Sequence, residues 1–291
     1  MNLNTNNKQD INLPLKDRMV VYVGVTAVLL VSWLYILGMG WHMNTLPFTT
    51  NTTMDMPMDH GDMNMPMNSS KSLVGSILSW MPPMDGVWSF KDFILLFLMW
   101  AVMMIAMMTP SILPMLLLFT TLILRRKEQG IEASSPLILL IGYLMSWVLF
   151  SLVITFPQYL MHQNGMLNPM MEPMHGYIGV IVLILAGIYQ FTPWKDACLS
   201  VCQSPIGFLT NNWKDGDLGA FIIGYRHGFY CIGCCWALML TLFALGVMNI
   251  MWVMVLTVFV LFEKLSYKHP LLFRRITGII FIAWGGSLAL L

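Results

Sequence analysis

The chain alternates long apolar stretches with short polar connections, which is the pattern of a protein that crosses a membrane several times. Seven windows approach the roughly 20 apolar residues that a helix needs to span a bilayer. They cover residues 19–39, 93–116, 136–156, 177–193, 220–247, 250–262 and 276–291. Because the last two windows are short, we expect an all-α polytopic transmembrane helical bundle of six to seven spans.

The composition agrees with this hydropathy pattern. Hydrophobic residues make up 57% of the 291 residues and charged residues only 10%, whereas soluble domains carry about 25% charged residues. The chain therefore lacks the polar surface of a soluble globule, and the lipid bilayer is an expected partner. A net charge of +1 gives no electrostatic basis for binding nucleic acid.

The distribution of cations predicts an orientation. If the windows cross in turn, thirteen of the fifteen lysines and arginines fall on the side of the N-terminus, and the other side keeps Lys71 and Lys91. The positive-inside rule then predicts a cytoplasmic N-terminus in a multi-pass protein of the cell membrane. The first window exceeds a signal-peptide core and lacks a small-x-small cleavage site, so we expect it to be retained. The predicted divisions are residues 1–39 (cytoplasmic tail and signal-anchor helix), 40–92 (outer loop) and 93–291 (membrane bundle).

The predicted outer loop is rich in methionine, which alternates there with Asp, Asn, Pro and a single histidine. Its low complexity predicts disorder. Thioethers suit soft Cu(I), so a string of them on the outer face can capture that ion. The simpler alternative is a methionine-rich linker without a ligand. The residues concerned are Met54, Met56, Met58, His60, Met63, Met65 and Met67.

Five cysteines gather on the predicted inner half, where a reducing cytosol keeps them as thiols available to metals. His227, Cys231, Cys234 and Cys235 fall within about 100° of one another on a helix. Imidazole and thiolate are the ligands that Cu(I) and Zn(II) prefer. The remaining cysteines, Cys198 and Cys202, are four residues apart and can chelate an ion or form a reversible disulfide. A hairpin near Gly207 can return both groups to the same membrane edge.

The second window carries a methionine stripe. Met104, Met107 and Met108 share a helix face with Trp100. Such a stripe can form the wall of a metal conduit, or it can be ordinary packing, because methionine is a flexible filler of helical interiors. Pro110 removes a backbone hydrogen bond and should kink this helix.

These motifs carry a resemblance to a known family. The chain resembles the DUF2182 family of predicted metal-binding integral membrane proteins over residues 93–291. It departs from the family pattern at Gln203, where members commonly have a basic residue. The resemblance implies a membrane protein that binds a metal, and no more. Its motifs are Trp100-x-x-Met103-Met104 with Pro110, Cys198-Leu199-x-x-Cys202, Arg226-His227-Gly228-x-Tyr230-Cys231-x-Gly233-Cys234-Cys235-Trp236 and Glu263-Lys264.

The leading functional hypothesis is a copper-handling membrane protein in which outer methionines capture Cu(I) and the cysteine/histidine cluster holds it. The protein would deliver the ion to a copper-dependent membrane enzyme during assembly of that enzyme, or move the ion across the membrane. Zinc is the alternative ion, although it gives no reason for the methionines. The sequence lacks a GxxxxGK[ST] phosphate-binding loop, which favours a chaperone over a pump, and no catalytic residue is assigned. The alternatives are a thiol/metal oxidoreductase and a structural subunit of a larger membrane complex, its cysteines being small buried residues.

Overall fold

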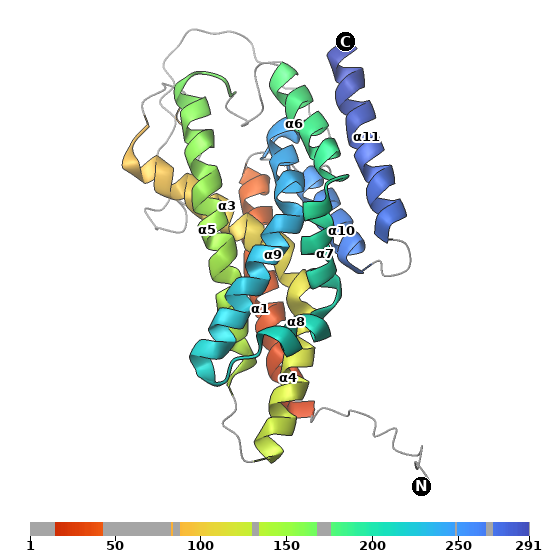
Figure 1. Cartoon of the computed structure of the whole chain (residues 1–291). Coiled ribbons are helices and arrows are strands. Elements are labelled where there is room, and N and C mark those ends of the chain that lie inside the picture. Colours follow the sequence, from red (N-terminus) through yellow and green to blue (C-terminus); the bar gives the residue numbers. More distant parts are fainter. Residues whose placement is uncertain are drawn as a thin grey trace.

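The computed structural model describes residues 15–42, 83, 88–129, 134–167, 176–247, 249–265 and 270–290, and all its elements are helices (Figure 1). The predicted all-α helical bundle is confirmed. The helices are α1 (Leu15–His42), α3 (Phe90–Met108), the 3₁₀ turn η1 (Thr109–Ile112), α4 (Leu113–Glu128), α5 (Pro136–Gln163), α6 (Gly176–Tyr189), α7 (Pro193–Gln203), α8 (Pro205–Asn212), α9 (Gly216–Leu245), α10 (Ile250–Leu265) and α11 (Pro270–Leu290).

Each of the seven predicted apolar windows lies largely within helix. Five helices of the described chain are long and apolar enough to cross a membrane, and a sixth span results if α6 and α7, bent by 67°, are taken together. α10 has only 16 residues, which is short for a crossing. The outside of the bundle is apolar: Val31, Val153 and Val258 are 67–70% exposed. An apolar exterior of this kind is what a lipid-facing surface requires.

Where a kink is predicted, at Pro110, the structure has a 3₁₀ turn in place of regular α-helix. α3 passes through η1 into α4, and together they form an apolar stretch of 38 residues. Pro110 has no amide hydrogen to donate, so the helical ladder is interrupted there. Nearby hydroxyls satisfy the local carbonyls: Thr109 donates to Ile105 O at 2.6 Å, and Ser111 donates to Met108 O at 2.8 Å. The break therefore places a polar turn inside the bundle.

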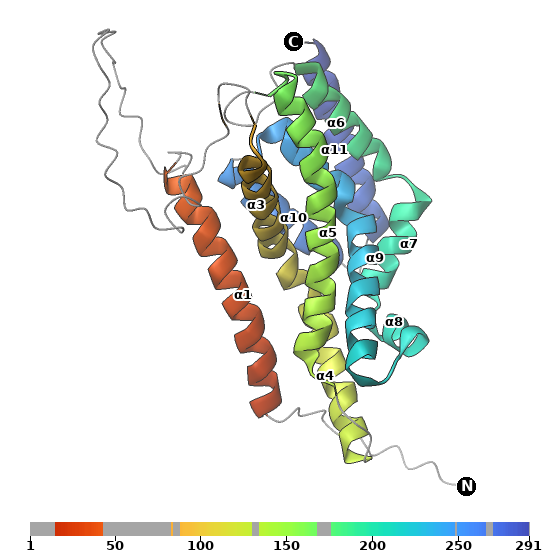
Figure 2. The same cartoon turned by 90° about the vertical axis from the view of Figure 1, so that its left-hand side faces the viewer.

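α9 is the central helix, and it packs against α5, α6 and α7 (Figures 1 and 2). Its contact with α5 depends on glycine. A Cβ atom at Gly224 would lie 2.0 Å from the carbonyl oxygen of Leu139, and one at Gly228 would lie 1.7 Å from Oγ of Ser146. Small residues of this kind let two helix backbones approach closely inside a membrane. The close approach fixes the α9 side chains relative to those of α5.

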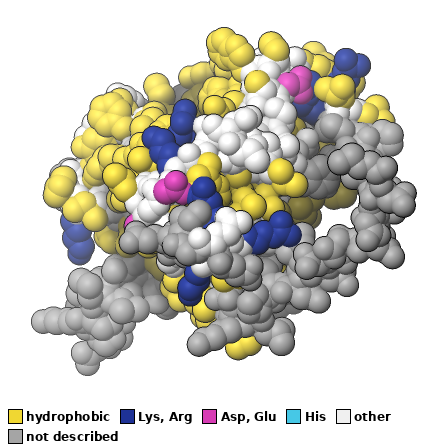
Figure 3. Space-filling view, turned by 60° about the horizontal axis from the view of Figure 1, so that its bottom comes forward, with side chains coloured by type: hydrophobic (Ala, Val, Ile, Leu, Met, Phe, Trp, Pro, Cys, Tyr) yellow, Lys and Arg dark blue, Asp and Glu magenta, His cyan; other side chains and the backbone are white. Residues whose placement is uncertain are grey.

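The end of the bundle where α4 stops and α9 starts is polar. Figure 3 shows lysine and arginine side chains among the hydrophobic ones on this face. Arg126 pairs with Asp215, the residue that precedes α9, and its guanidinium lies 4.7 Å from the centre of the Trp213 ring. The Trp213 indole donates to Asp215 at 2.8 Å. This hydrogen bond and the Arg126 charge lower the pKa of the Asp215 carboxyl.

The methionine-rich segment lies outside the described residues. This applies to the predicted copper-capturing residues Met54, Met56, Met58, His60, Met63, Met65 and Met67. The three-part division of the chain and the cytoplasmic N-terminus also stay predictions.

Candidate metal centre

Three cysteine sulfurs lie together in the middle of α9. Cys231, Cys234 and Cys235 are each 1% exposed. The Sγ atoms of Cys234 and Cys235 are 3.2 Å apart, and the Cys234 thiol donates to the carbonyl oxygen of Cys231 at 3.1 Å. All five cysteines of the chain are free thiols. The helix face that the spacing predicts is thus turned into the core and away from lipid.

The bend between α6 and α7 brings a second helix against this face. Pro193 begins α7, where its missing amide hydrogen costs nothing. The Thr192 hydroxyl caps the helix by accepting from the amide of Lys195 at 3.4 Å. Just before the bend, the Tyr189 hydroxyl donates to the carbonyl oxygen of Gly233 at 2.5 Å. This bond ties the start of the bend to the helix that carries the three cysteines.

α7 places the remaining two cysteines beside α9, as the hairpin prediction requires. Sγ of Cys202 lies 3.9 Å from Sγ of Cys234. Cys198 lies over Gly233. A Cβ atom at position 233 would be only 2.6 Å from the sulfur of Cys198. Glycine at position 233 is therefore what admits the Cys198 side chain. Cys198 and Cys202 are half-buried, so they form the outer margin of the sulfur cluster.

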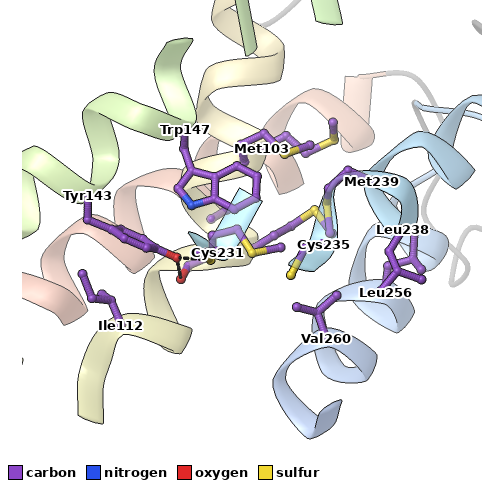
Figure 4. Packing of buried hydrophobic residues seen from close by; sticks show 14 of the residues in the cluster. Met103, Ile112, Tyr143, Trp147, Cys231, Cys235, Leu238, Met239, Leu256 and Val260 are labelled. Carbon is purple, nitrogen blue, oxygen red and sulfur yellow. Dashed lines mark hydrogen bonds between the residues drawn. The ribbon is translucent and has the colours of Figure 1, made fainter. Parts of the chain in front are cut away.

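A buried lysine that sequence reasoning did not place in the site faces the cluster. Nζ of Lys264, from the end of α10, lies 2.7 Å from Sγ of Cys231 and donates to Ser111 at 3.2 Å. The Tyr143 hydroxyl lies 3.0 Å from the same sulfur and donates to Met108 O at 3.2 Å (Figure 4). Cys231 thus stands between a hydroxyl and an ammonium. The sequence feature that could have revealed Lys264 is the charged pair Glu263-Lys264 at the end of an apolar helix. Ionisable residues are costly there unless they serve a function.

The charge next to Lys264 in the sequence is already paired. Glu263 lies 2.6 Å from Nζ of Lys195, and both side chains are buried, at 2% and 0% exposed. Gln190 also accepts a hydrogen bond from Lys195. In the described chain the three ion pairs are Arg126–Asp215, Lys195–Glu263 and Arg274–Asp196, so Lys264 has no carboxylate among them. Its nearest electron-rich partner is the Cys231 sulfur.

His227 lies one helical turn before Cys231 and is 3% exposed. Its ring is 5.3 Å from that of Phe208 and 6.0 Å from that of Tyr143. Its Nδ1 atom is buried and has no hydrogen-bond partner among the described residues. The imidazole therefore borders the sulfur cluster through aromatic contacts and keeps one nitrogen without a bond.

The predicted methionine stripe is buried, and its role as the wall of a metal conduit stays a prediction. Met104, Met107 and Met108 are each 0% exposed and pack within the large hydrophobic cluster. Met108 touches the cysteine site through its carbonyl oxygen, which accepts from Tyr143. Met103, on a neighbouring face of α3, is drawn with Met239 and Cys235 in the same packed region in Figure 4.

No three Cys, His, Asp or Glu side chains stand ready-made around a metal position within the described part of the chain. The sulfurs are instead engaged with one another, with the Cys231 carbonyl and with Lys264. Binding an ion between them requires rotation of cysteine side chains, chiefly Cys234, away from these hydrogen bonds. The assignment of these residues as metal ligands remains a prediction.

A bundle of apolar helices around a buried cluster of free thiols defines a helical protein of the membrane type with a candidate soft-metal site. Residues 97–288 match the family model described as PpoB2, copper chaperone. Because the match covers more than half of the chain, the protein belongs to this family. The predicted relation to copper is thereby confirmed at the level of the family, while the resemblance to the DUF2182 family stays a prediction. Neither a curated protein nor a solved structure matches the chain.

Proposed function

We propose that this protein is a membrane carrier of Cu(I) that receives the ion from its methionine-rich segment and holds it at the cysteine cluster for delivery to a copper-dependent membrane enzyme. The observation that carries the proposal is the buried group formed by Cys231, Cys234 and Cys235, with Cys202 3.9 Å from Cys234. The copper chaperone family supports the choice of metal.

The donor set favours a soft ion. Thiolates from α7 and α9 bind either Cu(I) or Zn(II), but thioethers select Cu(I). The methionines at positions 54–67 would then be the first ligands and the thiols the final ones. Thiols bind a metal after losing a proton, so transfer from thioether to thiolate releases protons and strengthens the binding.

Charge balance supports a monovalent ion at Cys231. Two thiolates and one Cu(I) carry a net charge of −1, which the ammonium of Lys264, 2.7 Å from the Cys231 sulfur, neutralises. Zn(II) normally takes four ligands, and with two thiolates and two neutral ligands its complex is already neutral, so the ammonium then remains without a counter-charge. Since a buried charge requires a partner, this arrangement favours Cu(I).

The experiment is a Cu(I) competition titration of purified full-length protein against a chromophoric chelator. The test variant is Cys231→Ala/Cys234→Ala/Cys235→Ala, and the control is Met145→Leu, an exposed residue of α5. We expect tight Cu(I) binding in the wild type and control and its loss in the triple variant. Far-UV circular dichroism and size-exclusion elution verify the fold. A folded triple variant that binds as much Cu(I) as tightly as the wild type overturns the proposal.

One observation favours a second candidate, a thiol oxidoreductase. Cys202 and Cys234 lie on different helices with sulfurs 3.9 Å apart. They are better placed to form a disulfide than Cys234 and Cys235, because adjacent Cα atoms are about 3.8 Å apart, short of the usual disulfide range. Thiol counting after addition of a quinone to the metal-free protein distinguishes the two functions. Loss of two thiols per chain with formation of one quinol indicates the oxidoreductase, and stoichiometric metal binding without loss of thiols to the quinone indicates the carrier.

A further inference from the structure

A small, partly open cavity lies between α1, α3 and the start of α10, apart from the cysteine cluster. Its volume is about 30 Å³, enough for one or two atoms the size of a water molecule. Three methionines line it, together with Tyr35, Val247 and Ile250. Met39 comes from α1, and Met99 and Met103 come from α3.

These methionines are arranged as a ligand set would be. Met99 and Met103 are four residues apart, so they lie on one face of α3. Met39 reaches the cavity from the helix opposite. All three are buried, at 6%, 4% and 4% exposed for Met39, Met99 and Met103. Methionine side chains are flexible, so a partly open cavity bordered by three thioethers is a place where an ion can be accommodated.

The side chains that line the cavity determine which kind of ion it can bind. The side chains offer thioether sulfur and one phenol, Tyr35, and no carboxylate or imidazole. Hard divalent cations need oxygen ligands, whereas Cu(I) and Ag(I) accept thioethers. Neutral ligands leave the positive charge of the ion uncompensated, so we expect weaker binding than at thiolates. A site that binds the ion more weakly than the thiolates is suited to an ion that moves on to them.

The position of the cavity also fits passage. Met39 lies in the last turn of α1, three residues before His42, and the methionine-rich run begins at Met54 in the sequence. On the other side, Met103 shares a packed region with Met239 and Cys235 (Figure 4). The cavity thus lies beside the end of α1, and Val247, two residues after the cysteine helix ends, is part of its lining.

We infer that Met39, Met99 and Met103 form a second site for a soft monovalent d¹⁰ cation, Cu(I) or Ag(I), which the ion occupies before it reaches the cysteines. This inference rests on the proposed copper-carrying function. No bond is made or broken besides metal–sulfur bonds, and no electron moves: the ion leaves three thioethers and is bound by thiolates, whose protons go to solvent.

The test counts Ag(I) ions bound to full-length protein that carries Cys231→Ala/Cys234→Ala/Cys235→Ala, with and without Met39→Leu/Met99→Leu/Met103→Leu. Met and Leu have similar volumes, so the packing is largely kept. Both proteins retain residues 54–67, and the contribution of that segment cancels in the difference. We expect the leucine substitutions to remove one Ag(I) per chain. The control pair Met145→Leu/Met251→Leu, both exposed, should remove none.

A second measurement follows the loading of Cu(I) onto the intact cysteines, through the ultraviolet absorption of the copper–thiolate complex after rapid mixing. In Met39→Leu/Met99→Leu/Met103→Leu we expect loading at least tenfold slower, with the same final amount of bound copper. If the triple leucine variant does not fold, Met103→Leu alone should slow loading at least threefold. An unchanged Ag(I) count together with unchanged loading overturns the cavity site and leaves the carrier function standing. Absence of copper at the wild-type cysteines overturns the carrier function itself.

Discussion

Lys264 and Cys231, 33 residues apart in the sequence, are joined by a contact of 2.7 Å between ammonium nitrogen and sulfur. The contact connects the end of α10 to the middle of α9 and sets against the cysteine cluster a lysine that has no carboxylate partner among the described residues. It also gives Cys231 an ammonium as a hydrogen-bond partner in addition to the neighbouring sulfurs. In our account this lysine is the counter-charge of the copper–thiolate complex.

Replacement of Lys264 by methionine should weaken Cu(I) binding about tenfold to a hundredfold, because hydrogen bonds to charged groups contribute about 1.5–3 kcal/mol. Zn(II) binding should weaken less, since its dithiolate complex needs no counter-charge. Lys264→Arg keeps the charge and should retain most of the Cu(I) affinity. Competition titrations with both metals measure these ratios. Equal losses for Cu(I) and Zn(II) in Lys264→Met would remove the counter-charge role.

Addition of a methyl group at Gly233 should separate α7 from α9. A Cβ atom there lies 2.6 Å from the Cys198 sulfur, so Gly233→Ala should cost about 1–3 kcal/mol of stability by overpacking and lower Cu(I) affinity. The matched control is Gly286→Ala in α11, where a Cβ atom meets nothing within 4 Å. Thermal unfolding in detergent and the copper titration provide the two readouts. A Gly233→Ala protein as stable as Gly286→Ala would show that α7 does not pack as described.

The Lys195–Glu263 pair should matter for stability more than for metal binding. Both charges are buried, 2.6 Å apart, so Glu263→Gln leaves an ammonium without its carboxylate, which typically costs about 3–5 kcal/mol. The double variant Lys195→Met/Glu263→Gln removes both charges and should recover most of that loss. Denaturant unfolding of the single and double variants measures the coupling. Additive losses would contradict a direct pair.

Acid should loosen the polar end of the bundle through Asp215. Its ordinary pKa of 3.8 is lowered in the folded protein, first by the hydrogen bond from Trp213 and then by Arg126. The contact therefore stabilises the fold above the ordinary pKa, and this contribution is lost as the pH falls through the lowered value. Asp215→Asn should flatten the dependence of the unfolding midpoint on pH below about 4. An unchanged pH profile in this variant would assign the acid sensitivity elsewhere.

Helical periodicity placed Cys231, Cys234 and Cys235 on one face, because the spacing along a single helix fixes which side chains adjoin. The return of Cys202 to that face was also predictable, from a short connection between two cysteine groups. Lys264 could not be placed in this way, since its contact with Cys231 depends on the packing of α10 against α9. From the sequence alone, Lys264 was only one of the positive charges expected near the membrane edge.

The methionines of α3 show a different limit. They occupy several faces of the helix, so spacing alone could not separate those that pack from those that border a cavity. Met104, Met107 and Met108 are fully buried in the core, while Met99 and Met103 line the void opposite Met39. Only the position of α1 distinguishes the two sets, and that position depends on tertiary contacts. Where two side-chain patterns overlap on one helix, the position of the neighbouring helix is needed to tell them apart.

Copper K-edge X-ray absorption of the Cu(I)-loaded full-length protein identifies the atoms that bind the ion and is the decisive measurement for a copper site at the cysteine cluster. We expect Cu(I) with sulfur alone as its nearest neighbours in the wild type, and loss of the thiolate component in Cys231→Ala/Cys234→Ala/Cys235→Ala. Copper bound through nitrogen or oxygen in the wild type, or a spectrum that the triple substitution leaves unchanged, would contradict it.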